Sequence, residues 1–120
     1  MPRFVVLEHD HPSLHWDLLL EAGSVLRAWR LARPPVSGEV ISAQANFDHR
    51  LFYLAYEGPV SGGRGTVKRW DAGDFSGPLD GNYFEIEIAG DKLRGVLTLQ
   101  RMDKDTWSLH YRETPSGVST

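Results

Sequence analysis

Glycine and proline interrupt the apolar segments of this chain at short intervals. The 120 residues include 12 Gly and 7 Pro, and the apolar runs between them recur about every ten residues. Runs of this length suit short antiparallel strands joined by tight turns better than helices. In one run, Phe84, Ile86 and Ile88 alternate with glutamates, as in a strand with one buried face. The spacing therefore predicts an all-β fold with little helix.

Turn-forming residues separate nine candidate strands. These strands cover residues 3–8, 15–21, 25–31, 40–47, 51–56, 66–70, 83–89, 93–101 and 107–111. Several breaks between them are short enough for hairpins, so neighbouring strands should pair antiparallel. An open sheet of so many short strands would leave two edges free to aggregate. We therefore predict a closed or nearly closed antiparallel β-barrel of about eight or nine strands, in preference to a two-sheet sandwich.

The composition is that of one globular domain over residues 1–120, with 41% hydrophobic residues and a formal net charge of -3. This charge provides no overall basic field, so any binding to nucleic acid has to be local. Ten of the 13 basic residues are arginine, whose planar guanidinium suits phosphate. The sequence has no cysteine, and we recognise neither a signal peptide nor an apolar stretch of membrane-spanning length. We expect a cytoplasmic protein without membrane contact.

The densest group of possible metal ligands lies between residues 9 and 17. If a strand begins at His15, its alternation places His15 and Asp17 on one face, with Cα atoms about 6 to 7 Å apart. An imidazole nitrogen and a carboxylate oxygen could then reach one ion at about 2.1 Å, and His9 could supply a third ligand from the end of the preceding strand. Such a set leaves positions open for water or substrate. The alternative is that these side chains belong to a loop and a solvated strand face.

A second group of chemically active residues follows residue 47. His49 and Tyr53 are four residues apart and can share a face. Histidine exchanges a proton near neutral pH, and a tyrosine hydroxyl can hold a phosphate oxygen. The alternative is a surface histidine beside a tyrosine that caps the core.

The glycine-rich segment at residues 58–65 does not match a nucleotide-binding Walker loop. No Gly-Lys-Ser/Thr sequence follows it, and the next element is a predicted strand rather than a helix. Arg64, Lys68 and Arg69 lie in or just after this segment. They could line a groove for a nucleic-acid backbone, or they could form a solvated basic strand.

Five blocks of the sequence resemble one known family in their order and spacing. The blocks are FVVLEHD from residue 4, LHWDL from residue 14, DH at residues 48–49 with Tyr53, EG at residues 57–58, and GTVKRWDAG from residue 65. Over about residues 4–111, the chain looks like the 3'-phosphoesterase domain of bacterial DNA ligase D, the multi-domain enzyme of non-homologous end joining.

This resemblance implies a closed β-barrel and a manganese-dependent enzyme that removes 3'-terminal phosphates and ribonucleotides from DNA or RNA. The expected cofactor is Mn²⁺ or another divalent metal. The expected partners are nucleic-acid 3' ends and, functionally, a repair polymerase and ligase. On the same resemblance, His9, His15 and Asp17 match the family's metal ligands, while His49 and Tyr53 match the catalytic residues on its phosphate side.

Two positions depart from the family pattern. Leu19 stands where the family has a phosphate-binding arginine, and Ile41 stands near the place of a second one. Each lost charge-assisted hydrogen bond typically forfeits about 1.5 to 3 kcal/mol, so activity should be reduced unless another cation substitutes. The candidate replacements are Arg30, Arg33, Arg50 and Arg64, of which Arg33 lies nearest to a basic family position.

Three functions are compatible with these residues. The first is a metal-dependent phosphoesterase that processes 3' ends. The second is a catalytically weakened module that binds a nucleic-acid end or another phosphate ligand. The third is a hydrolase of a small phosphoester, whose smaller anion needs fewer cations. Two histidines have no assigned role: His11 is expected in a loop or as a spare ligand, and His110 as a structural or groove-lining residue.

Overall fold

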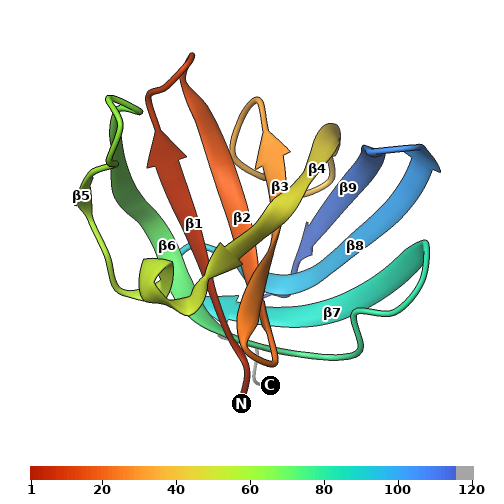
Figure 1. Ribbon diagram of the computed structural model, residues 1–120. Coiled ribbons are helices and arrows are strands. Elements are labelled where there is room, and N and C mark those ends of the chain that lie inside the picture. Colours follow the sequence, from red (N-terminus) through yellow and green to blue (C-terminus); the bar gives the residue numbers. More distant parts are fainter. Residues whose placement is uncertain (116–120) are drawn as a thin grey trace.

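The computed structural model describes residues 1–115, which form nine strands and one helical turn (Figure 1). The strands are β1 (Arg3–His9), β2 (His15–Ala22), β3 (Val25–Leu31), β4 (Val40–Arg50), β5 (Gly58–Pro59), β6 (Thr66–Ser76), β7 (Tyr83–Gly90), β8 (Arg94–Asp103) and β9 (Thr106–Glu113). The helical turn is the 3-10 helix η1 (Leu51–Leu54) between β4 and β5. The prediction of an all-β chain with little helix is confirmed.

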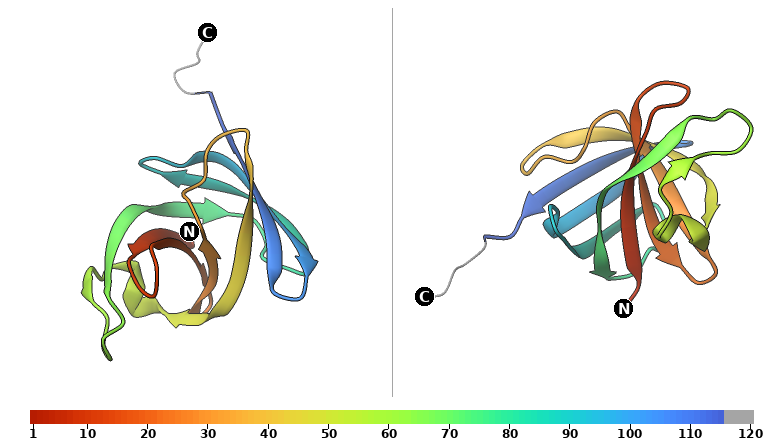
Figure 2. Two further views of the ribbon diagram at one scale, coloured as in Figure 1. Left: turned by 90° about the horizontal axis from the view of Figure 1, so that it is seen from above. Right: turned by 90° about the vertical axis from the view of Figure 1, so that its left-hand side faces the viewer.

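The strands form one antiparallel sheet that closes on itself. Its order is β1-β2-β3-β4-β9-β8-β7-β6-β5, and an additional pairing of β1 with β6 completes a barrel of eight strands. The two-residue strand β5 lies outside this ring and pairs only with β6. Figure 2 shows the curved wall that results. The closed antiparallel barrel predicted from the sequence is therefore confirmed, and closure removes the free edges that an open sheet would expose.

The barrel wall separates two apolar clusters. The larger cluster receives side chains from all eight barrel strands and fills the barrel, and the rings of Trp29, Phe84 and Trp107 pack against one another within it. The smaller cluster lies on the outer face of β1, β2, β3 and β6, and its members are Val5, Leu7, Leu19, Leu26, Ala28 and Val67. Because β1 and β2 are covered on both faces, they carry continuous apolar runs rather than simple alternation.

The segment that covers the outer cluster differs from the prediction. We expected a strand over residues 51–56, but residues 51–54 form the helix η1, and only Gly58 and Pro59 pair as a strand afterwards. Leu51, Tyr53 and Leu54 all pack against the outer cluster. A strand with a period of two would turn Leu54 away from Leu51 and Tyr53, whereas a 3-10 turn brings residues i and i+3 to one side. Packing on the outer cluster therefore explains the helical turn.

β4 and β6 run furthest past the ends that the sequence pattern predicts. β4 continues to Arg50 and β6 to Ser76, past the expected ends at residues 47 and 70. The extension of β4 includes His49, which pairs with Leu26 of β3 and lines the pocket of the candidate site. Among the described residues 1–115, no helix has the length and apolar character needed to cross a membrane.

Candidate metal centre and adjoining pocket

Three predicted metal ligands meet on the outer face of the barrel. His9 ends β1 and lies directly opposite His15, the first residue of β2. Asp17 follows on the same face of β2, and both Asp17 and His15 are buried. The possible ligand atoms of the three residues all lie within 4.8 Å of one another. The structure thus brings together His15 and Asp17, which the strand alternation placed on one face, and His9, which was expected from the end of the preceding strand.

Backbone carbonyls fix which nitrogen of each imidazole faces the centre of this cluster. His9 Nε2 lies 2.8 Å from the Arg64 carbonyl oxygen, and His15 Nδ1 lies 2.9 Å from that of Ser13. A carbonyl only accepts, so these nitrogens carry the hydrogens and donate them. The opposite nitrogens, His9 Nδ1 and His15 Nε2, are left free to bind a metal and point toward the Asp17 carboxylate.

The two distances from the imidazole nitrogens to the carboxylate fit ligands of a shared divalent ion. His9 Nδ1 and His15 Nε2 lie 3.3 and 3.2 Å from the Asp17 carboxylate oxygens. Ligands bound at about 2.1 Å in tetrahedral or octahedral geometry are separated by about 3.0 to 3.4 Å. With neutral imidazoles, three electron-pair donors face one point, an arrangement that requires a metal ion or added protons. The donor set of two imidazoles and one carboxylate therefore fits a catalytic divalent metal.

The proton affinity of His15 reflects the same surroundings. Burial lowers the pKa of His15, but the hydrogen bonds to Asp17 and to the Ser13 carbonyl, together with the Asp17 charge, raise it above 6.5 on balance. The Arg30 cation opposes this rise. In the metal-free protein, His15 is thus a better proton acceptor than in the unfolded chain.

This shift predicts how the stability of the metal-free protein depends on pH. The folded pKa of His15 lies above the unfolded value of 6.5, so its contribution to stability is full below pH 6.5 and disappears as the pH rises through the folded pKa. Urea unfolding in the presence of a chelator, between about pH 5 and 9, should show this loss. The difference in the free energy of unfolding between wild type and the His15→Gln variant should shrink with rising pH. A difference that grows with pH would contradict the prediction.

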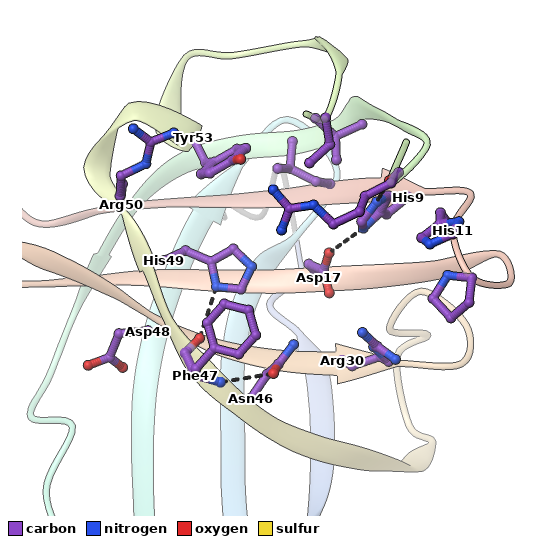
Figure 3. A pocket seen from close by; sticks show the side chains of 15 residues that line it. His9, His11, Asp17, Arg30, Asn46, Phe47, Asp48, His49, Arg50 and Tyr53 are labelled. Carbon is purple, nitrogen blue, oxygen red and sulfur yellow. Dashed lines mark hydrogen bonds and ion pairs between the residues drawn. The ribbon is translucent and has the colours of Figure 1, made fainter. Parts of the chain in front are cut away.

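A pocket of about 560 Å³ opens beside the three ligands. His9 and Asp17 line one part of it, and His49 and Tyr53 line another (Figure 3). His49 Nδ1 donates to the Phe47 carbonyl oxygen at 2.9 Å, which leaves Nε2 free for a ligand in the pocket. The Tyr53 ring packs against the edge of the His49 ring at a centroid distance of 5.8 Å. The two predicted catalytic residues therefore share one pocket with His9 and Asp17, two of the three candidate metal ligands.

A β-bulge places His49 in this pocket. Leu26 pairs with His49 while Ala28 pairs with Asn46, so three steps along β4 match two steps along β3. Strict alternation would place His49 and Ile41 on the same face of β4, and Ile41 faces the barrel interior. The extra residue reverses the alternation and brings His49 to the outer face with Asn46. Both residues line the pocket.

The sequence of this chain is similar to those of known proteins. A model of the DNA ligase D 3'-phosphoesterase domain matches residues 7–109. The chain belongs to this family. It is also 28% identical, over 125 residues, to the multifunctional non-homologous end joining protein LigD of Mycolicibacterium smegmatis. That match includes 90% of this chain but only 16% of the relative. The family resemblance seen in the sequence blocks is therefore confirmed.

The two positions where the resemblance led us to expect arginines differ in their surroundings. Leu19 is fully buried in the outer cluster, on the same face as Asp17, where it lies between Val5 and Ala28 of the neighbouring strands. Ile41 instead points into the barrel, away from the pocket. An arginine at position 41 would therefore not reach the pocket, and the expectation that Ile41 removes a phosphate contact is not supported by its orientation.

Arg30 is the arginine most closely tied to the candidate metal ligands. It lies directly opposite Asp17 in the pairing of β2 with β3 and lines the pocket. Its Nε is buried and has no hydrogen-bond partner among the described residues. A buried guanidinium nitrogen without an acceptor is costly unless a ligand supplies one. Arg30 therefore offers a cation on the same face as Leu19, one strand away.

The other three candidate arginines differ in position. Arg64 lines the pocket, but its Nε and terminal nitrogen donate to the Ser61 carbonyl and hydroxyl oxygens at 2.7 and 3.2 Å. Arg50 is exposed at the rim, over the rings of Phe52 and Tyr53. Arg33 does not line the pocket, and its side chain forms an exposed ion pair with Glu39. The structure therefore brings together Arg30, Arg50 and Arg64, but not Arg33.

The pocket also contains Asn46 and Phe47, which the sequence analysis did not single out. His11, which was expected in a loop or as a spare ligand, is exposed in the loop between β1 and β2 and also lines the pocket. His110 lies on β9, paired with Val40 and Thr98, and does not line this pocket. Asn46 lies next to the bulge in β4, and Phe47 lies within it. No alternation of residue types marks that bulge in the sequence, which is why both were missed.

Proposed function

We propose that the protein is a divalent-metal-dependent phosphoesterase that removes phosphate or a ribonucleotide from 3' ends of nucleic acid. The observation that carries this proposal is the convergence of three metal-binding atoms beside a pocket that contains Arg30, His49 and Tyr53. Membership of the DNA ligase D 3'-phosphoesterase family supports the reaction class. The similarity to a non-homologous end joining protein supports a role in DNA repair.

Each residue has a part in the proposed reaction. His9, His15 and Asp17 would hold the metal, with Mn²⁺ as the proposed ion. A bound divalent ion supplies Lewis-acid chemistry and lowers the pKa of a coordinated water. Water adds to phosphorus and releases its proton to solvent, the bond from phosphorus to the 3' oxygen breaks, and that oxygen takes up a proton. His49 in its protonated form, with Nδ1–H still bonded to the Phe47 carbonyl, would donate this proton from Nε2.

The remaining polar side chains would bind the phosphate. Arg30 would donate to its oxygens and offset the negative charge that builds up in the transition state. The Tyr53 hydroxyl would orient the group by a further hydrogen bond. Because the carbonyl of Phe47 already holds the His49 ring, little reorganisation is needed when the substrate enters.

A 3'-phosphorylated primer-template tests the proposed activity. With Mn²⁺ present, we expect a product whose 3'-hydroxyl a DNA polymerase can extend, and we expect none from the His15→Ala variant. A wild-type protein that binds Mn²⁺ and the phosphorylated DNA but releases no phosphate at high enzyme concentration would contradict catalysis. That outcome would indicate a binding module instead.

The proposal also extends to partners and location. A 3'-hydroxyl end is the substrate of polymerases and ligases, so we propose that such repair enzymes act after this protein. The chain spans only 16% of the relative that carries the end-joining name, and we propose a functional association with such enzymes. The cytoplasm is the proposed location, in keeping with a chain that has no cysteine.

A further inference from the structure

An exposed aromatic residue stands at the edge of the pocket without a structural reason for its exposure. Phe47 is 71% exposed, although it lines the same pocket as His49 and Asp17. A large apolar side chain that stays in water beside a polar site is typical of a contact surface. Phe47 is therefore a candidate to touch a ligand that enters the pocket.

The ring of Phe47 is held in a defined orientation. It stacks on the His49 ring with an interplanar angle of 10° and a centroid distance of 5.2 Å (Figure 3). The backbone on both sides of the bulge is also fixed, because the Phe47 N–H donates to Asn46 Oδ1 at 2.9 Å and its carbonyl accepts from His49. One ring face is thus covered by His49, and the high exposure of the side chain leaves the other face available.

The charges nearby favour a nucleotide over an apolar peptide. Arg30, Arg50 and Arg64 line the same pocket, and the Arg50 guanidinium lies 5.2 Å from the ring centroid of Phe52, another exposed aromatic residue. Cationic side chains interleaved with exposed aromatic rings are typical of surfaces that bind single-stranded nucleic acid. Asp48 is the acidic residue of the pocket next to Phe47 and His49, and its carboxylate points away from Asp17 (Figure 3).

We propose that Phe47, whose ring stacks on that of His49, is a stacking surface for the base of the 3'-terminal nucleotide. This inference rests on the proposed function for the identity of the ligand. It adds a base-binding element to a site otherwise described only by phosphate and metal contacts. Stacking tolerates any base because every base has a π face, so the surface would increase affinity for nucleotide ends without selecting a sequence.

A thermodynamic cycle that combines a change at Phe47 with removal of the terminal base of the ligand tests the inference by binding measurements alone. The ligands are two fluorescent single-stranded oligonucleotides ending in a 3'-hydroxyl, one ordinary and one whose last nucleotide lacks its base. Neither carries a 3'-phosphate, so dephosphorylation does not interfere. Fluorescence anisotropy in the presence of Mn²⁺ measures the affinity of the wild type and of three variants for each oligonucleotide. Phe47→Ala removes the ring, and Phe47→Trp is the conservative variant. Val36→Ala is the control, because Val36 is an exposed apolar residue outside the pocket.

The expected result is specific to the base. Phe47→Ala should weaken binding of the ordinary oligonucleotide by about five- to a hundredfold, and it should have little effect on the ligand that lacks the terminal base. Phe47→Trp should retain binding. If Phe47→Ala lost the same factor in affinity for both ligands, the inference would be overturned, because Phe47 would then act only by positioning His49. Wild-type affinity for both ligands in Phe47→Ala would also overturn it.

The binding experiment separates this inference from the proposed catalysis. If the protein fails to dephosphorylate a primer-template yet shows the base-dependent loss, the stacking surface stands and the catalytic proposal falls. If the protein is active but the two ligands respond equally to Phe47→Ala, only the stacking surface is rejected. Circular dichroism of each variant checks folding, which an exposed substitution should leave intact.

Discussion

Replacement of Asp17 by asparagine should weaken Mn²⁺ binding by about a hundredfold or more. The amide keeps the shape of the carboxylate but removes its charge, and Asp17 is the residue that both His9 Nδ1 and His15 Nε2 approach within 3.3 Å. Isothermal titration calorimetry of the metal-free protein would measure the change. Turnover of a 3'-phosphorylated substrate at limiting Mn²⁺ should fall in parallel.

Asp48 provides a matched control for this experiment. It is an exposed carboxylate that lines the same pocket but lies outside the three-ligand cluster. Asp48→Asn should bind Mn²⁺ with wild-type affinity. If Asp17→Asn also retained that affinity, or if Asp48→Asn lost it, the assignment of ligands would be wrong.

Replacement of Arg30 by glutamine should lower kcat/KM for a 3'-phosphorylated end by about ten- to a hundredfold. This corresponds to the loss of one charge-assisted hydrogen bond to phosphate, about 1.5 to 3 kcal/mol. Mn²⁺ affinity should not fall, because a cation beside the ligands repels the metal rather than attracting it. The two measurements together separate phosphate binding from metal binding.

Arg33→Gln is the matched control for Arg30→Gln. Both variants remove one positive charge, but Arg33 is exposed, pairs with Glu39 and does not line the pocket. Its kcat/KM should stay near the wild-type value. Equal losses in the two variants would indicate a general charge effect, and full activity of Arg30→Gln would remove Arg30 from the phosphate site.

Much of the fold could be predicted because the relevant signals are local. Turn residues and short apolar runs define the strands of the barrel, and the cost of exposed sheet edges predicts closure. The convergence of His9, His15 and Asp17 also followed from local rules, since a strand period of two fixes the shared face of β2. The predicted end of β1 brings His9 beside them through a short hairpin connection.

The parts that could not be predicted depend on tertiary packing. The turn at η1 forms because Leu51, Tyr53 and Leu54 pack on an outer cluster assembled from four distant strands. The bulge that directs His49 outward is visible only in the register between β3 and β4. Position 30 carries no motif, and its place opposite Asp17 follows from the hairpin register of β2 and β3, which the predicted strand ends alone do not fix. The strand registers therefore decide which arginine lies beside the metal ligands.

The location of the metal is tested most directly by anomalous X-ray scattering from crystals soaked in Mn²⁺. We expect one strong peak, bonded at about 2.1 Å to His9 Nδ1, His15 Nε2 and an Asp17 carboxylate oxygen, with its remaining ligands facing the pocket that contains His49 and Arg30. A peak held by other residues, or none at this cluster at saturating Mn²⁺, would contradict the proposed metal centre and the phosphoesterase mechanism built on it.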